Sequence, residues 1–298
     1  MSTNLIRTRT DFKELCSGGV IDVHDSATVE NGVNIVVEGE GRPIRIAAGA
    51  RIEAGAVIYS GAVIGENTVV SRGCSIGGDV LLGDRNSVLD QSVITGRVEV
   101  GDDNKIGPFS SIGQPAQHRT ASSDSGLIVI GSRNIVREFT TINRPTEELT
   151  IVGNDCYLMA YVHVPHDAVI DDFVTITNAS QIAGHVTIHH HVTLGLGATV
   201  HQYTIIGAGA MIAMGSVVSR DVPPYGLVGR VGIRGLNRIG MDRLGIDAGQ
   251  MQDLEDWYKL TKGQVSSDDL TQLTDRWWYQ DMAKFVKHSN RSRYVVTV

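Results

Sequence analysis

The stretch that decides the fold is IAAGARIEAGAVIYSGAVIGENTVVSRGCSI, residues 46–76, in which an aliphatic residue returns at every sixth position. These residues are Ile46, Ile52, Ile58, Ile64, Val70 and Ile76. An α-helix would repeat about every 3.6 residues and a half-buried strand every second residue, so neither pattern fits. A period of six is typical of a parallel β-helix, in which each hexad supplies one short strand and one turn.

The same period extends far beyond this stretch. It continues to Ile112, resumes at Ile130, Val136 and Ile142, and runs again from Val152 to Val218. Three hexads make one triangular coil, and the aliphatic side chains point inward and stack on those of the next coil. We therefore predict a mainly β solenoid, with regular coils from about residue 46 to 222. Residues 21–45 look like poorly phased strands, and residues 1–20 like a short cap.

Two polar segments, 113–128 and 143–151, interrupt the repeat. A solenoid accepts insertions as loops at a corner of the coil, and such loops often carry binding residues. We expect both segments to leave the coil in this way.

The pattern changes after Pro223 and Pro224, which cannot continue a central strand. Helical spacing follows, and the segment contains all three tryptophans of the chain. We predict two domains, the β-helix with its N-terminal extension over 1–228 and a C-terminal helical domain over 229–298. We expect its aromatic residues to form its own core; they are Trp257, Tyr258, Trp277, Trp278 and Phe285.

Composition excludes several classes of protein. The formal charge of −7 argues against a nucleic-acid surface. No apolar run is long enough to span a bilayer, and the first residues lack the apolar region of a signal peptide. Cys16, Cys74 and Cys156 are few, far apart and without a zinc-type CxxC pair, so we expect free thiols in a reducing cytoplasm.

Four histidines are expected to fall on one edge of the coils. With about eighteen residues per coil, positions 166, 184 and 202 stack about 4.8 Å apart. His163 and His166 share one hexad, and His185 and His201 flank the stacked positions above. Asp167 could orient an imidazole, and the bare backbone of Gly184 could approach an oxyanion. The run His189–His191 we interpret as exposed polar surface.

The residues alone leave two chemistries open. Neutral imidazoles could bind zinc, as in carbonic anhydrases built from hexapeptide repeats. Alternatively, one imidazole could act as a general base on a hydroxyl or an amine. A solenoid without catalytic function is a third possibility.

Residues from about 100 to 260 resemble the acyl-ACP:UDP-N-acetylglucosamine O-acyltransferases of lipid A biosynthesis. The resemblance is carried by IGSRNIVREFTTINR (130–144), YVHVPHDAVI (161–170), NASQIAGHVTI (178–188), ATVHQYTIIGAGAMI (198–212), RDVPPYGLV (220–228) and GLNRIGMDRLGI (235–246). It implies a left-handed parallel β-helix with a helical C-terminal domain, assembled as a homotrimer. It also implies acyl transfer from an acyl carrier protein, or from acyl-CoA, with no cofactor and no metal.

The resemblance assigns roles to individual residues. The expected general base is His166, with Asp167 beside it, and the expected oxyanion donor is the N–H of Gly184. Substrate contacts are expected at His163, His185, His201 and Gln202, and nucleotide or phosphopantetheine contacts at Asn237 and Arg243. Met214 falls where a glycine would leave the acyl groove open, so we expect medium or short acyl chains.

Some positions depart from the family. The loop that grips the sugar nucleotide reads GQPAQHRTASS (113–123), so His118 and Thr120 replace an acidic residue and a lysine. Asn143 replaces a histidine, Ile239 replaces a glutamate, and the N-terminus is longer. We therefore expect a (nucleotide-)sugar or related acceptor, and poor or altered binding of UDP-N-acetylglucosamine.

Overall fold

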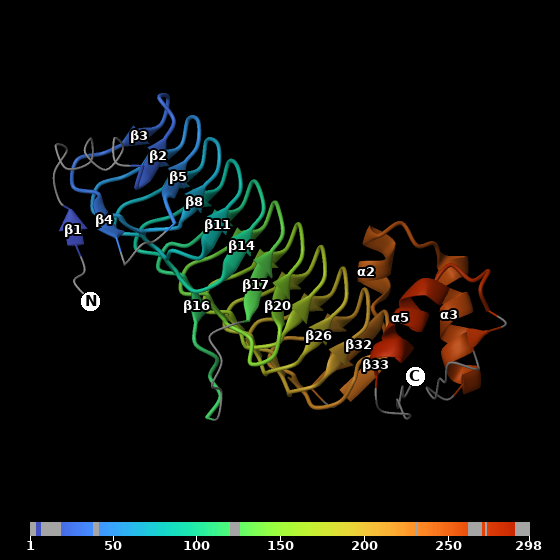
Figure 1. The fold of residues 1–298 in the computed structure, drawn as a ribbon. Helices are drawn as coiled ribbons and strands as arrows, with labels where there is room; N and C mark the ends of the chain where they lie inside the picture. The colour runs from blue at the N-terminus through green and yellow to red at the C-terminus, as the bar shows by residue number, and fades with distance from the viewer. Residues whose placement is uncertain are drawn as a thin grey trace. The chain divides into compact units, whose positions relative to one another are not determined.

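The computed structural model divides the chain into two compact units, residues 1–167 and 168–298. The residues that the structure describes are 4–6, 19–37, 42–119, 126–230, 232–261, 270–271 and 273–289. Short strands joined by tight turns make up the first unit and the first part of the second (Figure 1).

The first unit contains three sheets, named here A, B and C, which the chain visits in turn. Sheet A contains β1 (Asn4–Ile6), β4 (Asn34–Val37), β7 (Val57–Tyr59), β10 (Ser75–Ile76), β13 (Val93–Ile94), β16 (Ser111–Gln114), β19 (Thr141–Asn143) and β22 (His163–Val164). Sheet B contains β2 (Ile21–Val23), β5 (Ile44–Ile46), β8 (Val63–Ile64), β11 (Val80–Leu82), β14 (Val98–Val100), β17 (Leu127–Ile130) and β20 (Leu149–Val152). Sheet C contains β3 (Thr28–Val29), β6 (Arg51–Ile52), β9 (Val69–Val70), β12 (Ser87–Val88), β15 (Lys105–Ile106), β18 (Ile135–Val136) and β21 (Tyr157–Leu158).

Neighbouring strands of these sheets are parallel, apart from β1, which pairs antiparallel with β4. The register is regular except between β16 and β19, where it shifts between Ile112 and Gln114. Ile58 lies beside Ile76 and Ile76 beside Ile94, and all three side chains are fully buried. This arrangement confirms the predicted parallel β-helix.

The coils begin earlier than predicted. Strands β2, β3 and β4 already pair in parallel with β5, β6 and β7, so a start near residue 46 is wrong. The chain between Val37 and Ile44 is longer than a regular turn. This extra length breaks the six-residue spacing between the first coil and the later coils. The first coil is therefore not recognisable from the periodicity of the sequence.

At both predicted interruptions the structure has a longer connection between strands, but the ends of the segments 113–128 and 143–151 belong to strands. The first lies between β16 and β17 and leaves the coil (Figure 1); its residues 120–125 lie outside the described part of the chain. The second lies between β19 and β20. Each connects sheet A to sheet B, so the two loops leave successive coils at the same corner.

The second unit continues with the same kind of coil. Its sheets are β25 (Gln181–Ile182), β28 (Thr199–Val200) and β31 (Val217–Val218); β23 (Val169–Ile170), β26 (Thr187–Ile188) and β29 (Ile205–Ile206); and β24 (Thr175–Ile176), β27 (Thr193–Leu194), β30 (Met211–Ile212), β32 (Gly226–Gly229) and β33 (Gly232–Leu236). All neighbours are parallel except β32 and β33, which form an antiparallel pair.

Three helices follow: α2 (Arg238–Arg243), α3 (Ala248–Thr261) and α5 (Tyr279–His288) (Figure 1). The predicted aromatic core is confirmed, and it also takes in two residues of the last coils, Ile205 and Tyr225. Its buried members from the helical segment include Met241, Met251, Leu254, Trp257, Tyr258, Leu270, Trp278, Met282 and Phe285. The helical segment and the last coils therefore share one hydrophobic core. The division predicted at residue 228 stays a prediction.

The interpretation of His189–His191 as exposed surface is wrong for His189, which is fully buried. Helix α5 packs over this corner. His189 Nε2 lies 3.2 Å from Nδ1 of His288, and His190 Nε2 lies 2.7 Å from Asp281. Asp281 also accepts a hydrogen bond from the Tyr225 hydroxyl. The hexad pattern could not reveal this, because the covering helix lies far along the chain.

No helix in the described part of the chain is both long and apolar enough to cross a membrane.

Candidate functional site

The predicted base and its carboxylate lie at the corner that follows β22. His166 Nδ1 is 2.8 Å from Asp167 Oδ2, and both side chains are largely buried, with 10% and 6% of their areas exposed. Asp167 takes a left-handed backbone conformation, with φ of 58°. This turn places adjacent side chains close enough for the imidazole to donate its Nδ1–H to the carboxylate.

The second loop holds the Asp167 carboxylate in place. Thr146 donates from its backbone N–H at 3.0 Å and from its hydroxyl at 2.6 Å, and the N–H of Glu147 donates at 2.9 Å. The backbone N–H of Asp167 donates in turn to the Thr150 hydroxyl at 2.9 Å. Burial alone raises the pKa of a carboxyl group, but the hydrogen bonds from Thr146, Glu147 and His166 outweigh it and hold the pKa of Asp167 below its usual value. Asp167 is therefore an anion at neutral pH.

His163 opens strand β22, three residues before His166. Its Nδ1 is 2.7 Å from the Thr141 hydroxyl, on the neighbouring strand β19 of sheet A. Burial, and then the nearby His166, lower the pKa of His163. The ring is therefore a neutral hydrogen-bonding group at pH 7 rather than a cation.

The first loop reaches the same corner. His118 is exposed, and its ring meets that of His166 edge to face with centroids 5.6 Å apart. Asn143, which is buried, donates its side-chain N–H to the carbonyl of Pro115 at 2.7 Å and ties down the base of this loop. The predicted residues His118, His163, His166 and Asp167 are thus brought together within the first unit. Thr120 lies outside the described residues.

The predicted residues of the second unit include a backbone donor. Gly184 is buried, and its N–H makes no hydrogen bond with the described residues of that unit. The ring of His185 is half-buried and stacks on Tyr203 with centroids 4.5 Å apart. Tyr203 donates its N–H to the carbonyl of Gly184, which fixes this corner.

Three other predicted residues of this unit are exposed. The His201 Nδ1–H donates to the backbone carbonyl of Gln202 at 3.1 Å. Met214 follows β30 and is 62% exposed. The convergence of His163 and His166 with His185 and His201 stays a prediction, because these pairs belong to different units.

Asn237 precedes helix α2, and Arg243 is the last residue of that helix. The Asn237 side chain caps this helix by accepting from the N–H of Gly240, and it donates to the carbonyl of Gly209 at 2.9 Å. Arg243 is exposed in the last turn. The structure gives Asn237 a role in helix capping, and its predicted ligand contact stays a prediction.

Several supporting residues were missed from the sequence, notably Thr141, Thr146 and Thr150. Stacking arithmetic based on eighteen residues fails here because the second insertion lengthens this coil. Thr141 pairs with His163 across that insertion. The one signal in the sequence was the insertion at 143–151, which closely precedes the segment His163–Asp167.

This arrangement gives His166 the geometry of a general base. A histidine whose Nδ1–H is held by a buried anionic carboxylate keeps Nε2 as its basic nitrogen, as general bases require. In the zinc alternative, His163 and His166 could each offer only Nε2, because both Nδ1 atoms are engaged.

Comparison with known proteins agrees with this chemistry. The family model of UDP-N-acetylglucosamine O-acyltransferase, domain 2, matches residues 221–294. The acyl-[acyl-carrier-protein]–UDP-N-acetylglucosamine O-acyltransferase of Verminephrobacter eiseniae is 36% identical over 173 residues, which cover 56% of this chain and 66% of the relative. Its namesake in Stenotrophomonas maltophilia (strain R551-3) is 33% identical over 203 residues, which cover 64% of this chain and 77% of the relative.

Solved structures extend the likeness over nearly the whole chain. The UDP-N-acetylglucosamine acyltransferase of Bacteroides fragilis has a TM-score of 0.67 at 26% identity, covering 92% of this chain and 98% of that one. The enzyme of Campylobacter jejuni has a TM-score of 0.66 at 26% identity, covering 92% and 99%. The chain matches most of one relative in sequence and nearly all of these two structures in fold. It therefore belongs to the UDP-N-acetylglucosamine O-acyltransferase family.

Proposed function

We propose that this protein transfers an acyl group from the thioester of an acyl carrier protein to a hydroxyl group of a nucleotide sugar. The observation that carries the proposal is the buried His166–Asp167 pair, joined at 2.8 Å and anchored by the second loop, in a member of this family. Acyl-CoA is the second donor to test, and an amine the second kind of acceptor.

The pair accounts for both proton transfers. His166 Nε2 takes the proton of the acceptor hydroxyl as its oxygen attacks the thioester carbonyl. When the C–S bond breaks, the same nitrogen returns that proton to the departing sulfur. Asp167 keeps the other proton on Nδ1 and stabilises the imidazolium between the two steps. The oxyanion donor proposed for this step is the N–H of Gly184.

No cofactor is needed in this scheme, because the activated acyl group arrives on the donor. The reaction exchanges a thioester for an ester without a change in oxidation state. The imidazole supplies the acid and base chemistry that the transfer requires.

Acceptor choice is proposed to depend on the first loop. His118 lies against His166, at the place where the resemblance puts the residues that grip the sugar nucleotide. An imidazole there replaces a charged partner of the acceptor, and an unpaired buried polar group costs roughly 1–3 kcal/mol. Other nucleotide sugars are therefore expected to compete well with UDP-N-acetylglucosamine.

The proposed assembly is a cytoplasmic homotrimer that receives acyl carrier protein at its surface. The support for a trimer is the family resemblance, together with a histidine corner that a neighbouring subunit would enclose. Light scattering that finds only monomer at micromolar concentration would contradict this part of the proposal.

The activity is tested with the full-length protein, a set of acyl carrier proteins loaded with acyl groups of different length, and a set of UDP-sugars. Mass spectrometry of the products identifies the acceptor and the chain, and release of free thiol gives the rate. Failure of every donor to form an acylated sugar above the rate of the His166→Ala variant would refute the proposal.

A further inference from the structure

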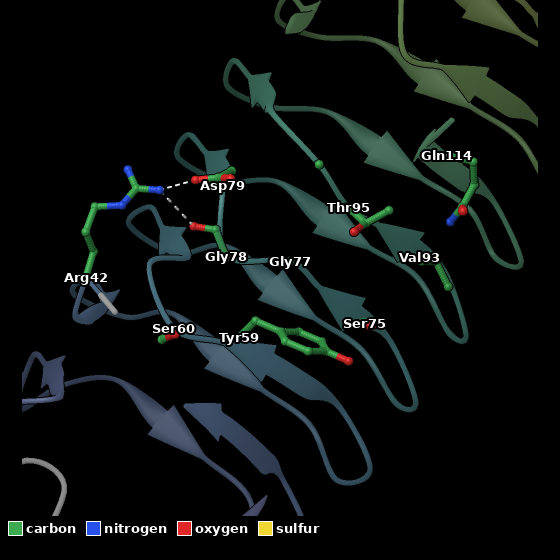
Figure 2. A pocket seen from close by; sticks show the side chains of 11 residues that line it. Arg42, Tyr59, Ser60, Ser75, Gly77, Gly78, Asp79, Val93, Thr95 and Gln114 are labelled. Carbon is green, nitrogen blue, oxygen red and sulfur yellow. Dashed lines mark hydrogen bonds and ion pairs between the residues drawn. The ribbon is translucent and has the colours of Figure 1, made fainter. Parts of the chain in front are cut away.

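Sheet A carries a concave surface in the first unit, on earlier coils than the histidine corner. A groove of about 610 Å³ lies over strands β7, β10, β13 and β16 (Figure 2). Its volume is in the range of ordinary small-molecule sites. The groove exists because the outward positions here are mostly small residues, such as Ser75, Gly77 and Gly96.

Four polar side chains line the groove and make no hydrogen bond with any other described residue: Tyr59, Ser75, Thr95 and Gln114. Figure 2 shows them on neighbouring strands, with Gln114 at one end. At the other rim, Arg42 forms an ion pair with Asp79 and donates to the carbonyl of Gly78 at 3.4 Å. Three hydroxyl groups and one amide are therefore available to a ligand.

The charges decide which ligand fits. Arg42 is the one cation among the lining residues, and Asp79 already neutralises it. A phosphate group would meet no unpaired cation among the lining residues. Arg144 approaches the groove behind Gly96, but it has a partner of its own. An acyl chain would find little apolar surface, since Val93 and the ring of Tyr59 are the main apolar groups. Hydroxyls, an amide and one aromatic ring are the groups that bind neutral sugars.

We propose that this groove binds a neutral, hydroxyl-rich ligand of the sugar class, held by Tyr59, Ser75, Thr95 and Gln114. The groove is a separate site. Gln114, the nearest of the four, lies on β16, two coil steps of about 4.8 Å, or about 10 Å in all, from the corner after β22. Thr95, on the β13 coil, lies one step further away. A single sugar unit does not bridge this distance, so the inference does not depend on the proposed acyl transfer.

Saturation-transfer NMR on the full-length protein tests the proposal, with glucose, N-acetylglucosamine and maltose as neutral probes and inorganic phosphate as the anionic one. We expect a neutral sugar to bind with Kd of about 1 mM, a free energy of about −4.1 kcal/mol. Ser75→Trp fills the groove and is expected to weaken binding at least tenfold. Thr95→Val, which removes one hydroxyl at constant shape, is expected to weaken it by a smaller factor.

Ser87→Trp is the matched control. Ser87 opens strand β12 of sheet C as Ser75 opens β10 of sheet A, and both are half-buried. This control should keep full binding, and equal melting temperatures of the two tryptophan variants would show that both fold. Absence of neutral-sugar binding, binding that survives Ser75→Trp, or phosphate binding that Ser75→Trp abolishes would each overturn the proposal.

Discussion

Thr146 donates two hydrogen bonds to the carboxylate of Asp167, one from its backbone N–H at 3.0 Å and one from its hydroxyl at 2.6 Å. The loop between β19 and β20 thereby fixes the side chain that orients His166 from the following corner. This loop is a positioning element for the histidine, and its contribution can be separated from that of the histidine itself.

We predict that Thr146→Val lowers kcat with little change in KM. The variant keeps the shape and the backbone donor but loses the hydroxyl donor. A hydrogen bond to a charged group contributes about 1.5–3 kcal/mol, which corresponds to roughly a tenfold to hundredfold decrease in rate. Thr146→Ser restores the hydroxyl and should recover most of the activity, as steady-state kinetics would reveal. Equal kcat for Val and Ser at this position would mean that the hydroxyl plays no part.

His166→Ala should reduce acyl transfer by about 10² to 10⁴, the usual contribution of a general base. The effect should fall on kcat, while the melting temperature changes little because the ring lies at a corner outside the aliphatic core. His24→Ala is the control, since His24 is an exposed histidine at an earlier corner. A His166→Ala enzyme with nearly full turnover would remove this residue from the mechanism.

Met214→Gly should shift the acyl preference toward longer chains. The Met214 side chain is 62% exposed after β30 and would obstruct a groove beside it. At about 0.8 kcal/mol per buried CH₂, a donor that is two or three carbons too long loses roughly 2 kcal/mol of binding. Competition between acyl carrier proteins with different chains measures this preference. An unchanged profile in the variant, or a wild-type preference for long chains, would show that Met214 does not set the length.

We predict that the helical segment becomes less stable as the pH decreases, because His189 is buried in its neutral form. Burial, and then the charge of Lys284, lower the pKa of His189 from 6.5 to about 4. The unfolded chain therefore binds this proton more readily, so the stability of the folded segment falls as the pH decreases from 6.5 toward 4. His190 acts in the opposite sense: its hydrogen bond to Asp281 raises its pKa, and that contribution is lost as the pH rises through the raised pKa.

Tryptophan emission during urea unfolding reports on this region directly, because all three tryptophans lie in the helical segment. His189→Gln should flatten the dependence of unfolding free energy on pH between 6.5 and 4, and His24→Gln should leave it as in wild type. An unaltered acid dependence in the His189 variant would assign the effect to other groups.

The fold was predictable because a six-residue period is visible wherever the coils are regular. Ile52, Ile58 and Ile64 were assigned inward, and each is fully buried. The pattern failed where the spacing changed, as between Val37 and Ile44. It also failed at His189, whose burial depends on a helix that sequence periodicity cannot place.

The histidines of the site were predictable from the sequence, but the residues that hydrogen-bond to them and hold them in place were not. His163, His166 and Asp167 belong to a recognisable segment, whereas Thr141 and Thr146 act through a loop whose path has no periodic signature. Short hydroxyl side chains are common on the outside of such coils. Only the folded loop distinguishes those that hold a catalytic group from those that face water.

The hydrophobic core shared by the last coils and the helices also covers the C-terminal end of the β-helix. A parallel coil ends in strands whose N–H and C=O groups, and whose aliphatic interior, would template a further coil from another molecule. Tyr225 and Ile205 are instead buried in one core with residues of α3 and α5, and the ring of Tyr225 lies 5.2 Å from that of Trp277. The helical segment thus stops one chain from stacking onto the next, and a chain shortened before Asn237 would be prone to grow into fibres.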